Sequence, residues 1–120
     1  MGPLELLRWQ WQGYAGYHRN RFNLVLHIVV VPMFWLGTIW LIMGVVSGSL
    51  AALITGAVYL FVSLLVQGKG HKLEPTPPAP FTSPWNFIAR LVFEQFITFP
   101  RFVLSGGWSR NLAANDGDAA

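Results

Sequence analysis

The sequence contains one long stretch without a charged side chain. Between Arg21 and Lys69 there is no Asp, Glu, Lys or Arg, and most positions are apolar. The turn-forming Ser-Gly-Ser at residues 47–49 divides this stretch into two parts. Each part is long enough for a membrane span of about 20 helical residues, and a charged side chain near the centre of such a span costs ~2.5–3.5 kcal/mol. The pattern therefore predicts a transmembrane helical hairpin, with helices over roughly 21–46 and 50–67.

Particular residue types mark where the other elements begin and bend. Asn20 is a residue type that caps helix N-termini, so we expect the first helix to begin directly after it. Pro32 should kink this helix, which membrane spans tolerate where neighbouring groups satisfy the freed backbone. The segment LEPTPPAPF (73–81) cannot be helical, and its prolines favour a stiff extended conformation. Ser83-Pro84 is typical of an N-cap followed by proline at the first helical position.

The region after these prolines has the pattern of an amphipathic helix over 85–103. Its apolar positions share one face, whereas Arg90, Glu94 and Arg101 lie on the other. This favours a helix lying in the membrane interface, with Arg90 and Glu94 paired across one turn. A third span would have to bury three charges, and we therefore rank that alternative second.

A shorter apolar pattern over residues 4–14 predicts a second interfacial helix near the N-terminus. The expected fold class is therefore an all-α integral membrane protein, built from a transmembrane helical hairpin plus amphipathic, interfacial helices. Residues 1–110 are expected to form a single membrane-embedded helical domain, and residues 111–120 a disordered C-terminal tail.

Composition and charge agree with a membrane protein and exclude one class of partner. Only 11% of the residues are charged, against about 25% in a typical soluble domain. The basic residues are scattered singly rather than clustered, which argues against a nucleic-acid partner. They flank the hairpin on both sides while its turn is uncharged, so the positive-inside rule places both ends of the hairpin in the cytoplasm. Because the chain has no cysteine, a transition metal would have to be held by His, Asp or Glu.

The hairpin brings two of the three histidines to one depth. His27 and His71 are nearly equidistant from Gly48, so at a rise of about 1.5 Å per residue they lie within ~3 Å of the same height. That height is the cytoplasmic edge of the bilayer. His18 would lie on the opposite face of a continuous helix, so it can join the other two only if the first helix begins after it. An N-cap at Asn20 would allow this.

Polar residues accompany these histidines at helical spacing. Asn23 lies four residues before His27 and Gln67 four residues before His71, so each amide can hydrogen bond to the second nitrogen of its histidine. Glu74 has three interpretations: a fourth metal ligand, a hydrogen-bond partner for a ligand, or a solvated charge. A single histidine in an apolar helix is usually structural, but an ionisable group inside a span also indicates function. The common height of the histidines favours a metal site.

Two segments carry a family resemblance, YHRNRFNLVLHIVVVP (17–32) and QGKGHKLEPTPPAPF (67–81). They resemble the two signatures of the Mpo1-like membrane family, whose characterised fungal member is a 2-hydroxy fatty acid dioxygenase of the endoplasmic reticulum. FEQFITFPRFVLSGGW (93–108) is similar to the C-terminal half of the short bacterial members. This chain has Arg-Asn-Arg-Phe where many members carry a proline-containing insert, and it is shorter than the fungal form. The matching positions are Tyr17, His18, Asn23, His27, Pro32, Gln67, Gly70, His71, Glu74 and Pro77 or Pro78.

The resemblance implies an Fe(II)-dependent dioxygenase that acts on 2-hydroxy fatty acids in the membrane, uses O2 and shortens the acid by one carbon. It implies iron ligation by His18, His27 and His71, in keeping with the N and O ligands of non-haem oxygenases. Zn or Mn fits three imidazoles nearly as well, so the choice of iron depends on the resemblance. His71 and Glu74 are the expected catalytic residues.

Residues around these ligands are expected to have supporting roles. The two amides that precede the histidines would orient them, and Glu94 would do so too unless it simply pairs with Arg90. Lys72 and Arg101 would neutralise the carboxylate of the substrate, and the alternative for each is a plain interfacial anchor.

The main alternative function is that of a non-enzymatic membrane protein that binds lipid or organises the membrane, whose stability would not respond to chelators. Haem ligation by paired histidines is a further alternative, and a Soret band in the purified protein would reveal it. The bacterial-type resemblance indicates the bacterial inner membrane as the location. A homodimer is compatible with the sequence.

Overall fold

The structure, a computed structural model, describes residues 1–119, and all regular secondary structure among these residues is helical. The predicted all-α fold class is therefore confirmed. The elements are α1 (Pro3–Tyr14), the short 3-10 turn η1 (Ala15–Tyr17), α2 (Arg21–Ser47), α3 (Leu50–His71), α4 (Pro84–Phe93), the π-helical turn η2 (Glu94–Thr98), α5 (Phe99–Leu104) and α6 (Gly107–Ala119).

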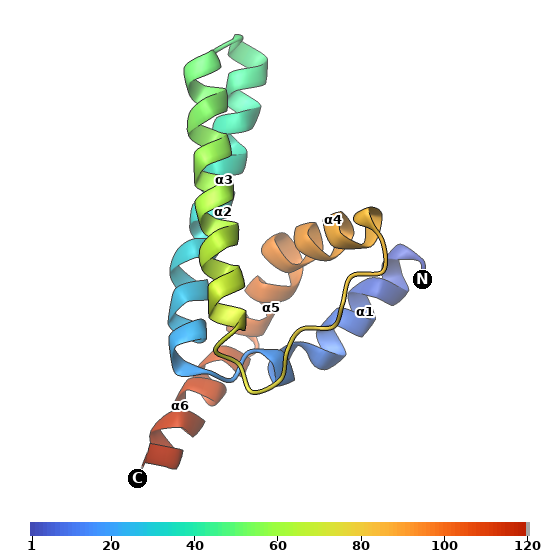
Figure 1. Ribbon diagram of the computed structural model, residues 1–120, viewed down its shortest axis with the longest axis vertical. Helices are drawn as coiled ribbons and strands as arrows, with labels where there is room; N and C mark the ends of the chain where they lie inside the picture. The colour runs from blue at the N-terminus through green and yellow to red at the C-terminus, as the bar shows by residue number, and fades with distance from the viewer. Residues whose placement is uncertain (120) are drawn as a thin grey trace.

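Helices α2 and α3 form the predicted antiparallel hairpin, which stands out from the other helices as a long arm (Figure 1). Asn20 caps α2 as expected, because its side chain accepts a hydrogen bond from the backbone N–H of Asn23. At the far end the chain turns at Gly48, whose φ of 65° is the left-handed conformation that favours glycine. Ser49 then caps α3.

Helix α3 is longer than the sequence predicted. It continues through Gly68 and Gly70 to His71 instead of ending near residue 67. Gly70 faces Asn23 of α2 so closely that a Cβ there would overlap the Asn23 amide oxygen. This glycine therefore permits a close approach of the two helices, and the predicted end of the second helix near residue 67 was too early by about one turn.

Glycines also allow close contact in the middle of the hairpin. A Cβ on Gly56 of α3 would lie 2.6 Å from the backbone oxygen of Gly37, and one on Gly44 would lie 2.8 Å from the Leu53 side chain. Small residues at such crossings let backbones approach, which is how membrane helices gain packing energy without a hydrophobic driving force between them.

The outer faces of the hairpin are apolar and uncovered. Both α2 and α3 are long and apolar enough to cross a membrane, and only 28% and 22% of their most hydropathic windows are buried. The core helix of a soluble protein would be mostly buried, so this exposure fits contact with lipid. The exposed apolar side chains include Leu36, Ile39, Ile42, Val45, Ile54, Val58, Phe61 and Leu65.

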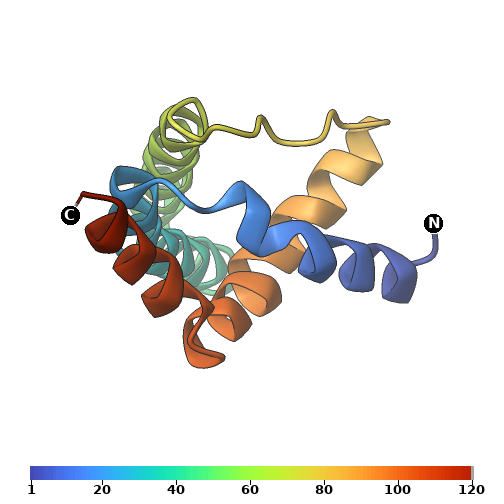
Figure 2. The ribbon, with the colours of Figure 1, turned by 90° about the horizontal axis from the view of Figure 1, so that it is seen from below.

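The remaining helices gather at the open end of the hairpin (Figures 1 and 2). Helix α1 packs against α4 and η2, and α6 packs against α2 and α5. The largely extended segment 72–83, hereafter the proline segment, connects α3 to the outer end of α4. Ser83 accepts a hydrogen bond from the backbone N–H of Asn86 and Pro84 follows it, which confirms the predicted start of α4.

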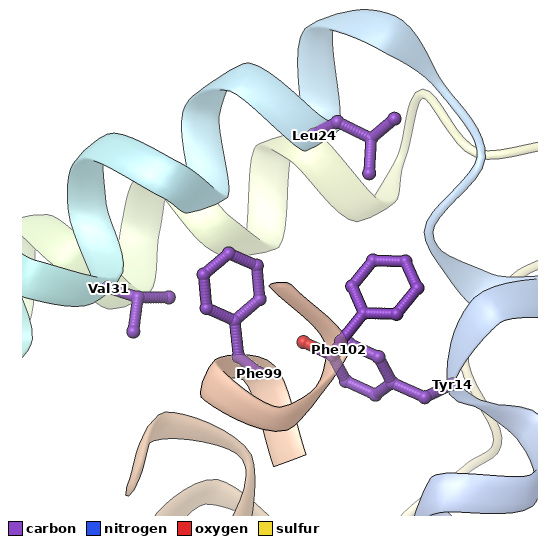
Figure 3. Packing of buried hydrophobic residues seen from close by; sticks show 5 residues of the cluster. All are labelled: Tyr14, Leu24, Val31, Phe99 and Phe102. Carbon is purple, nitrogen blue, oxygen red and sulfur yellow. The ribbon is translucent and has the colours of Figure 1, made fainter. Parts of the chain in front are cut away.

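A small aromatic and aliphatic core holds this end together (Figure 3). Tyr14 of α1, Leu24 and Val31 of α2, and Phe99 and Phe102 of α5 are all at most 3% exposed. The core therefore joins the first half of α2 to the N-terminal and C-terminal helices, and it lies directly beside the histidines described below.

The predicted amphipathic helix over 85–103 is present but divided. Helices α4 and α5 are joined by η2, in which the backbone N–H of Phe99 donates to the carbonyl of Glu94, five residues back. Pro100 follows immediately and cannot donate to the carbonyl four residues before it, so the regular helical pattern is broken here in any case.

The C-terminal residues differ from the expectation of a disordered tail over 111–120. The structure describes helix α6 up to Ala119, and residue 120 lies outside the described residues. Asn111 donates to the backbone oxygens of Ala15 and His18, and Asn115 donates to that of Arg19. These amides connect α6 to the segment that leads into α2.

Candidate metal centre

Three histidines and one glutamate converge at the open end of the hairpin. One ligand atom from each of His18, His27, His71 and Glu94 lies within 4.8 Å of all the others. The histidine rings stand nearly perpendicular to one another, with centroids 4.9–5.0 Å apart. The depth argument from the hairpin thus correctly brought His27 and His71 together.

His18 reaches this group because the chain is not helical around it. It lies between η1 and α2 with φ −134° and ψ 65°, so the argument that α2 must begin after it is confirmed. Its ring stacks on Tyr14 at a centroid distance of 3.8 Å. The elements supply one ligand each: the η1–α2 connection, the second turn of α2, the last residue of α3 and the first residue of η2.

Hydrogen bonds fix the orientation of two of the rings. His18 Nδ1 lies 2.8 Å from the carbonyl oxygen of Tyr14, and His27 Nδ1 lies 3.0 Å from that of Asn23. A carbonyl oxygen can only accept, so each ring carries its proton on Nδ1 and presents the lone pair of Nε2 to the cluster. This is the arrangement that metal-ligating histidines usually have.

One ring nitrogen of each histidine has no hydrogen-bond partner among the described residues. His18 Nε2, His27 Nε2 and His71 Nδ1 are all buried and unpaired. A buried polar atom without a partner costs about 1–3 kcal/mol, and native structures rarely leave several together. Three such nitrogens on rings of one cluster therefore fit a metal ion.

Glu94 contributes a carboxylate to the group. Its Oε2 accepts a hydrogen bond of 2.8 Å from the Tyr14 hydroxyl and lies 3.3 Å from His18 Nε2 and 4.0 Å from His27 Nε2. Burial opposes ionisation, but the three neighbouring histidines, His18 most strongly, lower the pKa of the Glu94 carboxyl to about 2. Burial and the Glu94 charge raise the pKa of Tyr14 well above its usual range, so its hydroxyl stays a donor.

The expected pairing of Glu94 with Arg90 is replaced by other contacts. Glu94 faces the histidines, while Arg90 donates to the carbonyl oxygens of Ala79 and Pro80 in the proline segment. The sequence had placed Glu94 on a polar helix face and in a supporting role. The structure brings it among the candidate ligands, because the cluster and not solvent lies on that side.

Glu74, the other acidic candidate, lies beside the cluster and makes different contacts. Its carboxylate accepts from the backbone N–H groups of Arg19 and Asn20 at 2.7 and 3.0 Å and from the Asn23 side chain at 2.6 Å. Its own N–H donates to the carbonyl of His71. These contacts match none of the three interpretations, because the carboxylate is buried and bonds to groups next to the candidate ligands rather than to a ligand itself.

The two amides expected to hold the second histidine nitrogens have other partners. The Asn23 side chain donates to Glu74, and it is the backbone carbonyl of Asn23 that contacts His27. Gln67 hydrogen bonds to Ser63 and Gln95 instead of His71. Helical spacing correctly placed both residues near the site, but it does not determine where an amide points.

Gln95 was not found from the sequence. It is fully buried and forms a reciprocal amide pair with Gln67, with N···O distances of 3.0 and 2.8 Å. Ser63 accepts from Gln67 and donates to the carbonyl of Val30 in α2. The signal that could have revealed this network was the presence of Ser63 and Gln67 in a span, since polar residues there usually pair with one another.

A cavity of about 810 Å³ adjoins the cluster, and His18, His71 and Glu94 form part of its wall. Most of the remaining wall is apolar and comes from α1, α3, α4 and the proline segment. Lys72 lies on this wall. Arg101, the other residue expected to bind the substrate carboxylate, instead stacks over Trp11 at 3.9 Å and is outside the described lining of the cavity.

Comparison with known protein families gives a match over most of the chain. The family model described as "2-hydroxy-palmitic acid dioxygenase Mpo1-like" matches residues 4–101. No curated protein and no solved structure matches the chain. The matched region includes all four residues of the cluster and most of the cavity wall.

Proposed function

This chain belongs to the Mpo1-like family, and on that basis we propose that it is a membrane-embedded, Fe(II)-dependent dioxygenase that shortens 2-hydroxy fatty acids by one carbon. The observation that carries the proposal is the set of three buried imidazole nitrogens, unpartnered among the described residues, beside the Glu94 carboxyl group. With O2 as the oxidant the reaction balances: R–CH(OH)–COOH and O2 give R–COOH, CO2 and water.

The four converging residues would hold the metal. Three neutral imidazoles and one carboxylate form an N and O ligand set of the kind that non-haem Fe(II) enzymes use, and it would also accept Zn or Mn. Bound Fe(II) would supply the binding and activation of O2. We assign the carboxylate ligand to Glu94, whose Oε2 faces the histidines.

The surrounding residues orient these ligands. The carbonyls of Tyr14 and Asn23 keep the protons of His18 and His27 on Nδ1, away from the cluster. The Tyr14 hydroxyl donates to Glu94 and so restricts the carboxylate to one orientation. We assign Glu74 a positioning role, because its oxygens contact the backbone next to His18 and the side chain of Asn23.

The head group of the substrate would lie where the cavity meets the cluster. A 2-hydroxy acid offers two adjacent oxygens, a hydroxyl and a carboxylate, which suit a metal site, and the Lys72 ammonium would pair with the carboxylate. The hairpin anchors the protein in the membrane, with both hairpin ends in the cytoplasm by the positive-inside rule, and the bacterial inner membrane is the proposed location.

The test is oxygen consumption by the iron-loaded protein in lipid nanodiscs. We expect 2-hydroxyhexadecanoate to drive oxygen uptake and to yield pentadecanoate, detected by mass spectrometry. Hexadecanoate is the matched control, because it has the same chain without the hydroxyl group, and it should not react. His71→Ala should abolish the uptake.

A non-enzymatic lipid-binding protein makes the opposite prediction. It would bind both acids, consume no oxygen with either, and be unaffected by removal of the metal. In such a protein the three buried ring nitrogens of the cluster would have neither a metal ion nor a hydrogen-bond partner among the described residues. For that reason we prefer the enzyme.

A further inference from the structure

The cavity beside the metal cluster has two chemically different parts. His18, His71 and Glu94 contribute polar atoms to its wall, and Trp9, Leu64 and Phe87 are among its apolar residues. The prolines Pro77 and Pro78 cover part of it. A volume of about 810 Å³ falls in the range of 300–1,000 Å³ that is usual for small-molecule sites.

Arg90 lies on the apolar part of this wall, but its guanidinium group already has hydrogen-bond acceptors and aromatic neighbours within the protein. Its two terminal nitrogens donate to the carbonyl oxygens of Pro80 and Ala79 at 3.1 and 2.9 Å. Its guanidinium group also lies over the rings of Phe81 and Trp9, at 4.2 and 5.0 Å from their centroids. Arg90 therefore holds the proline segment in place and is a poor site for a second carboxylate, so the polar end of a ligand belongs at the cluster.

Helix α3 lines the cavity with one stripe of residues that ends at the cluster. Leu64, Gly68 and His71 follow one another at intervals of four and three residues, so they share a face of the helix. A Cβ on Gly68 would meet nothing within 4 Å. The glycine therefore leaves empty space one turn away from a candidate metal ligand, and packing against another helix does not require it.

We propose that this cavity binds the acyl chain of the 2-hydroxy acid, with the head group at the His/Glu cluster, and that Gly68 is a specificity-determining residue that keeps the cavity wide enough for a long chain. The proposal rests on the proposed function and deepens it. The acyl chain lies between α1, α3, α4 and the proline segment, and not against the outer faces of the hairpin.

The test introduces bulk at Gly68 without disturbing the fold. Gly68→Leu adds a side chain that points into the cavity, and leucine also favours the helix over glycine. The matched control is Leu65→Phe, which adds bulk on the same helix at a position that is 50% exposed and outside the described cavity wall. Each variant is compared with wild type by oxygen uptake and by equilibrium dialysis of labelled 2-hydroxyhexadecanoate against the zinc-loaded protein in nanodiscs.

We expect Gly68→Leu to lower kcat/KM for 2-hydroxyhexadecanoate relative to 2-hydroxybutanoate, whose chain ends before Gly68, by about tenfold or more, with a matching loss of binding of the long acid. Leu65→Phe should leave the chain-length preference and the binding of the long acid unchanged. An unchanged chain-length preference and unchanged binding in Gly68→Leu would overturn the assignment of the cavity, while the dioxygenase would stand.

The two proposals fail in distinguishable ways. In one outcome, the wild-type protein binds the long acid but consumes no oxygen with the long or the short 2-hydroxy acid, and Gly68→Leu loses the binding. The proposed dioxygenase activity is then wrong, and the acyl site is supported. If wild type and Gly68→Leu bind the long acid equally, the acyl site is overturned whatever the activity.

Discussion

Glu74 and Glu94 have the same side chain but lie in different surroundings, and these surroundings decide what each can do. Glu94 is directed at three histidines and held by the Tyr14 hydroxyl. Glu74 accepts from two backbone N–H groups before α2 and from the Asn23 amide. Sequence reasoning singled out Glu74 because it follows His71 closely, whereas the contact of Glu94 with the histidines comes from a segment distant in sequence.

Substitution of Glu74 should reduce stability. Glu74→Ala removes a carboxylate that accepts at least three hydrogen bonds, and it leaves the Asn23 amide and two backbone donors without their partner. Loss of hydrogen bonds to a charged group of this kind should lower the free energy of unfolding by about 2–4 kcal/mol, measured by reversible denaturation in mixed micelles. Glu5→Ala, at an exposed position of α1, is the control and should change stability little. Equal stability of the two variants would contradict the positioning role of Glu74.

Removal of the Tyr14 hydroxyl should weaken metal binding without unfolding the protein. Tyr14→Phe keeps the ring that stacks on His18 and packs on Phe102, and it removes only the donor to Glu94. Loss of such a partner typically lowers metal affinity about 10–100-fold, which competition with a chromophoric chelator would measure. Tyr59→Phe, about 18 Å further along α3 from His71 at the helical rise, should bind metal as wild type does. An unchanged affinity in Tyr14→Phe would show that the hydroxyl does not support the ligand.

Helices bring these residues together, and much of that arrangement could be predicted. The uncharged stretch with one Ser-Gly-Ser turn predicted the hairpin, and the equal distances of His27 and His71 from the turn predicted their meeting. The position of Glu94 could not be predicted in the same way. An amphipathic pattern identifies an apolar and a polar face, but it does not show which other element will cover the polar face.

The π-helical turn η2 is a second feature that the pattern did not reveal. Two adjacent residues at its start face the interior: Glu94 joins the histidines, and Gln95 pairs with Gln67. The sequence shows only that Pro100 interrupts the hydrogen-bond pattern nearby, and several local arrangements can accommodate a proline.

The approach of α3 to α2 at Gly70 should be sensitive to a single methyl group. Gly70→Ala would place a Cβ on the Asn23 amide oxygen, and Asn23 holds both Glu74 and the His27 ring. We expect a loss of about 1–3 kcal/mol in unfolding free energy together with weaker metal binding. Gly68→Ala is the matched control two residues away, where a Cβ meets nothing, and it should be as stable as wild type or more so. If Gly70→Ala and Gly68→Ala have the same unfolding free energy and the same metal affinity, the close approach of α3 to α2 is not needed for either property.

The whole molecule consists of an apolar helical hairpin with a candidate metal site at its open end, and this site joins separate parts of the chain. The ligands come from the η1–α2 connection, α2, α3 and η2. A metal that binds the folded state alone stabilises it through mass action. Metal binding should therefore stabilise the packing of the N-terminal and C-terminal helices against the hairpin.

Removal of the metal should lower the thermal stability of the protein. A chelator such as EDTA should reduce the Tm by several degrees, because about 2.7 kcal/mol of stability is lost when a ligand that was present at 100 times its Kd is removed. Differential scanning fluorimetry would follow this, and added Fe(II) or Zn should restore the Tm. A Tm that does not respond to chelator would indicate that the four residues do not hold a metal in the folded protein.

The metal content of the purified protein after anaerobic exposure to Fe(II) decides whether this site exists. Elemental analysis of the wild-type protein should give one iron per chain. The His27→Ala variant should retain almost none, because alanine is compatible with helix α2 but lacks the buried Nε2. Glu5→Ala should bind as wild type does, and size-exclusion chromatography should confirm that each variant is folded. A metal-free wild-type protein, or a folded His27→Ala variant with its full iron content, would contradict the metal centre proposed here.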